Sequence, residues 1–192
     1  IGQTVTLKWG LTKSSNNISA YLMKQYGPNA MVEMMRKMGV GSFLDPVYPL
    51  CVGSADISVY EMVSAYNTFP SKGVYVSPIF VTRIEDSMGN VLGEFNNQKR
   101  EAVSEYTAYL MANLMQGVVN SGTGIRLRAK YGLKGEIAGK TGTAENPHGR
   151  DHGWFVAYGP FDNPTIVVAV IVEQGGYGSQ SAVPIGKKIL DA

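Results

Sequence analysis

Two short groups of residues carry side chains that could transfer an acyl group: Ser14-Ser15-Asn16 and Lys140-Thr141-Gly142-Thr143. Acyl transfer requires a nucleophile, a group that moves a proton, and donors that stabilise the developing oxyanion. We expect Ser14 to pass a proton between the cleft and the leaving amine, with Lys140 as its charged neighbour. General acid–base steps of this kind contribute ~10²–10⁴ in rate.

The second group has the pattern of a β-strand, in which alternate side chains point to opposite faces. Lys140 would then point toward the Ser14 loop, while Thr141 and Thr143 would offer two hydroxyls to a substrate carboxylate. Gly142 would let a ligand backbone lie close to the strand, whose exposed edge could pair with a peptide. The N–H of Thr143 is the expected oxyanion donor, and losing such a donor costs ~10²–10³ in rate.

Asn16 completes the first group because its amide both donates and accepts, and so could hold a substrate carbonyl. Each group alone is a weak signal. Ser14 could equally cap a helix, and Lys-Thr-Gly could be an ordinary strand entering a turn. Together, a Ser-x-Asn element and Lys-Thr-Gly are typical of serine acyl-transferases that attack amides and β-lactams.

The elements around these groups follow from hydrophobic periodicity and from turn and cap residues. Helices are predicted over residues 16–27, 29–39, 58–70, 104–124 and 183–192, a hairpin over 76–95, and strands over 135–145, 153–160 and 165–174. Helices come first, then neighbouring strands, then a last helix. This order predicts an α+β fold with an antiparallel sheet packed with helices.

Two of these helices carry further signals. Ser58 and Glu61 have the spacing of a capping box. Four methionines of the helix over 29–39 share one face, where filling a core is the expected role rather than binding a partner. These are Met31, Met34, Met35 and Met38.

Composition bounds the class of protein. The chain has 192 residues, 44% hydrophobic and 17% charged, which suits one folded domain and argues against disorder. The net charge is +2, without a run of Lys or Arg, so nothing indicates a nucleic-acid partner. The one cysteine, Cys51, is expected to be a small buried apolar residue.

The sequence around the motifs resembles the transpeptidase domain of penicillin-binding proteins. The similarity covers residues 9–27, 56–86, 117–128, 137–146 and 153–160, in the order of that family. It implies a fold that is part of the penicillin-binding-protein and serine β-lactamase type. It also implies peptidoglycan D-alanyl-D-alanine transpeptidation, inhibition by β-lactams, and no metal or organic cofactor.

Carried over by position, the resemblance implies roles for six residues. Ser14, Asn16 and Lys140 would be catalytic, while Thr141, Gly142 and Thr143 would bind substrate. Partners would be stem peptides and β-lactams, at the periplasmic or extracytoplasmic face of the bacterial membrane. No membrane anchor is evident in the chain, whose longest strongly apolar run is residues 166–172.

Two departures from the family pattern accompany the resemblance. No serine lies three residues before any lysine, so the Ser-x-x-Lys motif with the nucleophile is absent. We therefore expect residues 1–192 to be the C-terminal part of the domain, lacking the N-terminal strands and nucleophile helix, inactive alone and prone to self-association. The second departure is a mixed subclass signal: the chain resembles class A enzymes up to about residue 143 and class B enzymes after it.

The sequence also admits three other interpretations. The stretch Lys134–Thr141 nearly matches a P-loop, but the position of the first glycine holds Lys134, and a P-loop must open a helix. His148 and His152 have zinc spacing only if helical, which Pro147 and Gly149 oppose. A non-catalytic module with a degenerate transpeptidase fold is the third.

Overall fold

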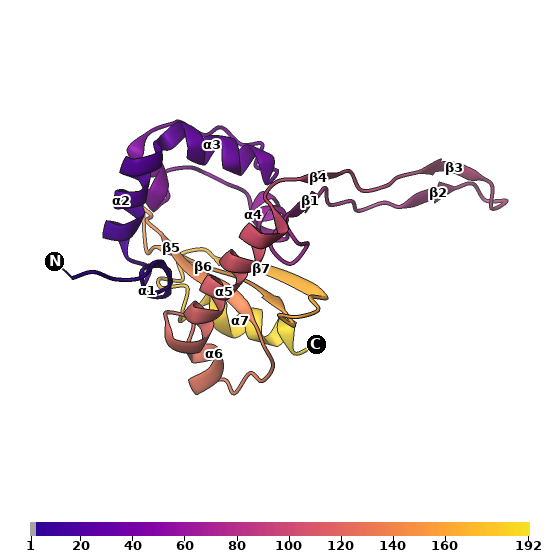
Figure 1. Ribbon diagram of the computed structural model, residues 1–192. Helices are drawn as coiled ribbons and strands as arrows, with labels where there is room; N and C mark the ends of the chain where they lie inside the picture. The colour runs from indigo at the N-terminus through magenta and orange to yellow at the C-terminus, as the bar shows by residue number, and fades with distance from the viewer. Residues whose placement is uncertain (1–2) are drawn as a thin grey trace.

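A three-stranded antiparallel sheet forms the centre of the computed structural model, which describes residues 3–192 (Figure 1). Its strands lie in the order β5 (Ala138–Ala144), β6 (His152–Gly159) and β7 (Ile166–Val172). The register pairs Lys140 with Val156 and Thr141 with Phe155. The three predicted strands and their antiparallel arrangement are therefore confirmed.

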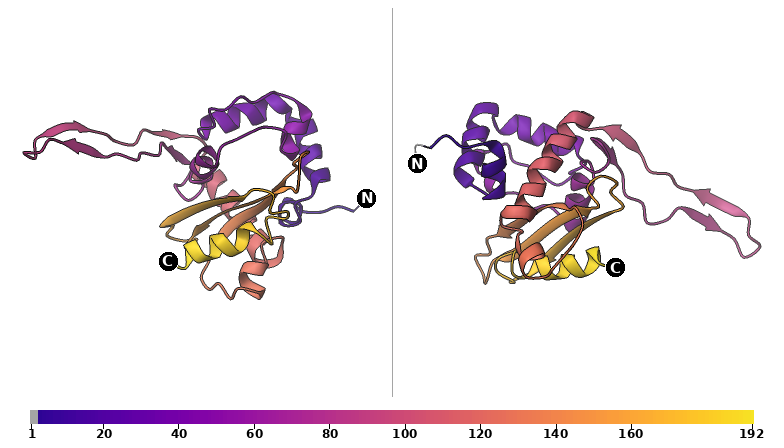
Figure 2. Two further views of the ribbon diagram at one scale, coloured as in Figure 1. Left: turned by 180° about the vertical axis from the view of Figure 1, so that it is seen from behind. Right: turned by 60° about the horizontal axis from the view of Figure 1, so that its bottom comes forward.

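Helices pack on both sides of this sheet. Helix α7 (Ala182–Leu190) lies across β6 and β7, where Phe155, Val170 and Val183 share a core (Figure 2). Helix α5 (Glu105–Ser121) packs along β5, and its Met115 meets Tyr158 in a separate cluster. The short helix α6 (Arg126–Ala129) adds the fully buried Leu127 to the first core. Apolar burial on both faces is what stabilises so small a sheet.

The N-terminal part of the chain is helical and has a core of its own. It comprises α1 (Leu7–Thr12), α2 (Asn16–Tyr26), α3 (Pro28–Lys37), the 3₁₀ turn η1 (Tyr48–Val52) and α4 (Val59–Tyr66). Met31, Met35 and Met38 pack into this core, as does the half-buried Cys51. Met34 is 39% exposed, so core filling was predicted correctly for three methionines and wrongly for the fourth.

The capping box at the start of α4 is present and also joins two segments. Ser58 Oγ accepts from the Glu61 N–H at 3.2 Å, and the Glu61 carboxylate accepts from the Ser58 N–H at 3.1 Å. The same carboxylate accepts from the N–H groups of Gly41 and Ser42 at 2.8 and 2.7 Å. The bonds from Ser42 and Ser58, with that from the Ser42 hydroxyl foremost, lower the pKa of Glu61 to about 2.

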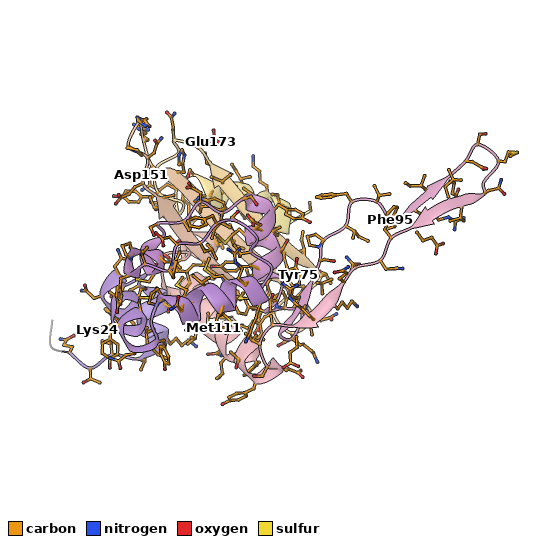
Figure 3. All side chains as sticks on the ribbon, turned by 90° about the horizontal axis from the view of Figure 1, so that it is seen from above. Lys24, Tyr75, Phe95, Met111, Asp151 and Glu173 are labelled. Carbon is orange, nitrogen blue, oxygen red and sulfur yellow. The ribbon has the colours of Figure 1, made fainter. Side chains whose placement is uncertain are left out.

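A long two-stranded ribbon projects away from the rest of the molecule (Figures 1 and 2). Its base pairs β1 (Val74–Val76) with β4 (Lys99–Glu101), and its outer part pairs β2 (Arg83–Glu85) with β3 (Val91–Glu94). Figure 3 shows Tyr75 at the base and Phe95 further out along the ribbon. The predicted hairpin is confirmed, although its strands are shorter than the sequence indicated.

The fold class predicted from the sequence is confirmed, and the five predicted helices are present. The sequence did not indicate the short helices α1 and α6, the turn η1, or the pairing of β1 with β4. Among residues 3–192, no helix combines the length and the apolar character needed to cross a bilayer.

Candidate active site

Lys140 occupies the third position of β5, a strand that pairs only with β6 among the residues the structure describes. Its side chain points to the face opposite that of Thr141, as strand alternation requires. The partly buried side chain crosses to the loop between α1 and α2. The predicted orientation of Lys140 toward the Ser14 loop is therefore present.

Ser14 lies in this loop in an uncommon backbone conformation. Its φ is 51°, in the left-handed region that side chains other than glycine rarely adopt. The turn is closed by hydrogen bonds from the N–H of Ser14 to Leu11 and from the N–H of Ser15 to Gly10, at 3.1 and 2.9 Å. Asn16 follows as the first residue of α2 and is exposed. The loop therefore presents the Ser14 hydroxyl from a constrained turn.

The two predicted groups meet through a direct hydrogen bond. Lys140 Nζ donates to Ser14 Oγ at 2.5 Å and to the carbonyl oxygen of Thr141 at 2.7 Å. Burial lowers the pKa of Lys140 to about 8, because a low-dielectric surrounding disfavours its charged form. A lysine with a pKa near neutrality can exchange a proton with a neighbouring hydroxyl at physiological pH.

Thr141 points to the other face and meets a residue that sequence reasoning did not single out. Thr141 is buried, and its hydroxyl donates to Thr123 Oγ1 at 2.6 Å. Thr123 follows the C-terminal end of α5, and its own N–H donates to the carbonyl of Thr12 at 3.3 Å. The sequence signal that could have identified it is the stretch Ser121-Gly122-Thr123-Gly124 just past a helix end.

The remaining predicted residues, Gly142 and Thr143, lie toward the C-terminal end of β5. Thr143 is exposed and shares the face of Thr141. Gly142 lies opposite Trp154, and a Cβ at Gly142 would come within 3.2 Å of the Trp154 Cβ. The absent side chain at Gly142 therefore accommodates the neighbouring strand as well as leaving space beside β5.

The other interpretations of the sequence can be compared with these positions. Lys140 and Thr141 lie inside a strand, whereas the lysine of a P-loop lies at the start of a helix. His148 lies in a turn and His152 begins β6, where its Nδ1 accepts from the N–H of Gln174 at 3.0 Å. Neither arrangement is the one that the alternative would need.

Two surface hollows lie around α4 and β7 and do not include Ser14 or Lys140.

The sequence matches the family model described as the penicillin binding protein transpeptidase domain over residues 1–191. It is 29% identical over 185 residues to penicillin-binding protein 1A of Aquifex aeolicus. That match covers 94% of this chain and 24% of the relative, so the chain spans about a quarter of the relative's length.

Two solved structures are similar over almost the whole chain. The ceftriaxone acyl-enzyme complex of penicillin-binding protein A from Mycobacterium tuberculosis matches with a TM-score of 0.86 at 24% identity, which supports the fold alone. The D,D-transpeptidase domain of a peptidoglycan glycosyltransferase from Eggerthella lenta matches with a TM-score of 0.78 at 25% identity. The matched regions cover 97% of this chain in both cases, and 48% and 54% of the two solved chains.

Proposed function

Because the chain belongs to the penicillin-binding protein transpeptidase family, we propose that it is the C-terminal part of a serine-type D-alanyl-D-alanine transpeptidase. The reaction would cross-link peptidoglycan stem peptides, and β-lactams would inhibit it by acylating the nucleophile. The observation that carries this proposal is the 2.5 Å hydrogen bond between Lys140 and Ser14, which unites the two halves of a proton-transfer site.

Ser14 and Lys140 would move the proton. The nucleophile's proton must reach the leaving amine, and a hydroxyl held beside a lysine of pKa about 8 can relay it. Asn16 would hold a substrate amide carbonyl, because its exposed side chain both donates and accepts.

The end of β5 would bind the rest of the substrate. Thr141 and Thr143 share one face of the strand and would bind the substrate carboxylate. The Thr141 hydroxyl, which donates to Thr123 in this structure, would turn its proton to the carboxylate. The carbonyl of Thr141 accepts from Lys140 Nζ, and alternate residues of a strand direct their peptide groups to the same edge. The N–H of Thr143 would therefore point to the same edge of β5 as the Thr141 carbonyl and serve as an oxyanion donor. Gly142, which has no side chain, would leave room between these two residues.

The nucleophile would come from a Ser-x-x-Lys segment outside residues 1–192, since no serine here lies three residues before a lysine. The matched region is about half of each solved chain, which leaves room for such a segment in a protein of this kind. We call the polypeptide that carries both parts the complete protein. It would act on the extracytoplasmic face of the bacterial membrane, where stem peptides are found.

The test is covalent labelling with a fluorescent penicillin. The complete protein should form a stable acyl adduct, and Lys140→Ala should slow its formation by ~10²–10⁴. Lys134→Ala is the matched control, because Lys134 is an exposed lysine just before β5. Wild-type labelling by Lys140→Ala would remove Lys140 from the mechanism.

Residues 1–192 alone should neither label nor turn over a D-alanyl-D-alanine peptide, because the Ser-x-x-Lys motif is absent. A stable adduct on any serine of this chain would refute the proposed source of the nucleophile. Absence of labelling in the complete protein would instead favour a non-catalytic module that keeps the transpeptidase fold.

A further inference from the structure

Thr123 connects the two parts of the proposed site. Its backbone N–H donates to the carbonyl of Thr12 at 3.3 Å, two residues before Ser14. Its hydroxyl accepts from the Thr141 hydroxyl at 2.6 Å, one residue after Lys140. One residue therefore touches both the turn that carries Ser14 and the strand that carries Lys140, and its hydroxyl bonds to neither of those two side chains.

The end of α5 is shaped to bring Thr123 into this place. Gly122 ends the helix, and a Cβ on it would lie 2.3 Å from the Thr12 carbonyl oxygen. Gly117, five residues earlier, would place a Cβ 2.7 Å from Thr12 Oγ1. Two glycines thus let α5 approach α1 more closely than any side chain would permit. The buried Thr12 lies between them.

The hydroxyl pair also sets what Thr141 can offer to a ligand. The proton of Thr141 is directed toward Thr123, so the hydroxyl of Thr123 keeps its own proton for a further acceptor. Thr141 is buried, and a buried hydroxyl without a partner is costly, so the pair fixes its rotamer.

We propose, on the basis of the proposed transpeptidase function, that Thr123 is a positioning residue that holds the Ser14 turn against the Lys140 strand and orients the Thr141 hydroxyl. It does not act on the substrate bond itself. Its contribution comes through the distance between Ser14 Oγ and Lys140 Nζ, and through the rotamer of Thr141, the residue proposed to meet the substrate carboxylate.

The experiment compares Thr123→Val, which keeps the shape and removes the hydroxyl, with Thr123→Ser, which keeps the hydroxyl. Thr82→Val is the matched control, because Thr82 is an exposed threonine on the projecting ribbon. The rate of acylation by benzylpenicillin and the melting temperature are measured in the complete protein. Thr123→Val should acylate about tenfold more slowly, the size of one lost hydrogen bond, and Thr123→Ser should restore the rate.

A second readout separates this inference from the proposed function. Without the hydrogen bond between Thr141 and Thr123, the Ser14 turn can move away from β5 and expose Lys140 to water. The pKa of Lys140, followed by NMR of its labelled side chain, should therefore rise in Thr123→Val and not in Thr123→Ser. If wild type labels and Thr123→Val matches it in rate and Lys140 titration, the positioning role is wrong while the transpeptidase remains. If wild type does not label, the proposed function fails, and the Lys140 titration alone decides on Thr123. A pKa shift in Thr123→Val then supports the positioning role, and an unchanged pKa overturns it.

Discussion

The Lys140 ammonium lies 2.5 Å from the Ser14 hydroxyl oxygen, although 126 positions separate the two residues in the chain. Ser14 is held in a closed turn with a φ of 51°, and Lys140 is held by its place on β5. Neither side chain needs to search for the other, so the contact is preorganised. A preorganised pair of this kind is what proton transfer requires.

The first prediction concerns the charge on Lys140. Burial brings its pKa down to about 8, so the charged form that we assign to the proton relay is lost as pH rises through that value. The acylation rate of the complete protein should therefore have an alkaline limb with a midpoint near 8. Stopped-flow measurements with a penicillin between pH 6 and 10 would locate it.

Lys140→Arg provides the matched variant, because a guanidinium stays charged throughout that range. We expect this variant to lose the limb near pH 8, whatever its absolute rate. A wild-type profile that stays flat up to pH 10 would contradict the assignment of Lys140.

The second prediction concerns the backbone of Ser14. A side chain in the left-handed region costs roughly 1–2 kcal/mol, and glycine avoids this cost. Ser14→Gly should therefore be about 1 kcal/mol more stable than Ser14→Ala in urea unfolding, the reverse of the usual order of these residues. Both variants should slow acylation by about 10² or more, since both remove the relay hydroxyl. Equal stabilities would show that the turn relaxes when the hydroxyl is lost.

Ser14 and Lys140 could be predicted to meet because a Ser-x-Asn element and Lys-Thr-Gly occur together in serine acyl-transferases. The orientation of Lys140 on its strand follows from a local signal. The Lys-Thr-Gly stretch has the alternation of a strand, and this alone places Lys140 and Thr141 on opposite faces. The helix cap at Ser58 likewise depends on nearby residues, and it is present as predicted. Residue type and spacing are sufficient for such features.

Thr123 could not be predicted because its role depends on how two elements cross. The end of α5 meets both α1 and β5, and only the packed structure shows that Thr123 contacts Thr12 and Thr141. The pairing of β1 with β4 was missed for a related reason. These strands have three residues each, too few for an alternating pattern, and they join across the whole ribbon.

The third prediction concerns acid stability through Glu61. Its pKa is about 2, below the ordinary 4.5, so its carboxylate contributes stability that is present above pH 4.5 and lost as pH falls toward 2. Glu61→Gln should be less stable than wild type at pH 7, and the difference should shrink between pH 4.5 and 2. Urea unfolding at several pH values measures this difference.

Glu33→Gln is the control for that series, because Glu33 is an exposed acid on the neighbouring helix α3. It removes the same charge without the bonds to Gly41, Ser42 and Ser58. A pH-independent difference for Glu61→Gln would mean that the carboxylate acts through its shape and not through its charge.

The last prediction concerns the contact between α5 and α1. A Cβ at Gly122 would lie 2.3 Å from the Thr12 carbonyl oxygen and 2.9 Å from its Cγ2, and both are atoms of a buried residue that cannot move freely. Gly122→Ala should therefore cost ~1–3 kcal/mol in unfolding free energy, as overpacking in a filled core does. It should also push the Ser14 turn away from β5. Acylation should therefore be slower even at temperatures well below the melting temperature, where the variant is folded. Gly93→Ala, on the projecting ribbon, is the matched control, because the nearest atoms to its added Cβ would be those of the Phe95 ring, 3.7 Å away. If Gly122→Ala were as stable and as reactive as Gly93→Ala, close approach of α5 to α1 would not be what sets the distance between Ser14 and Lys140.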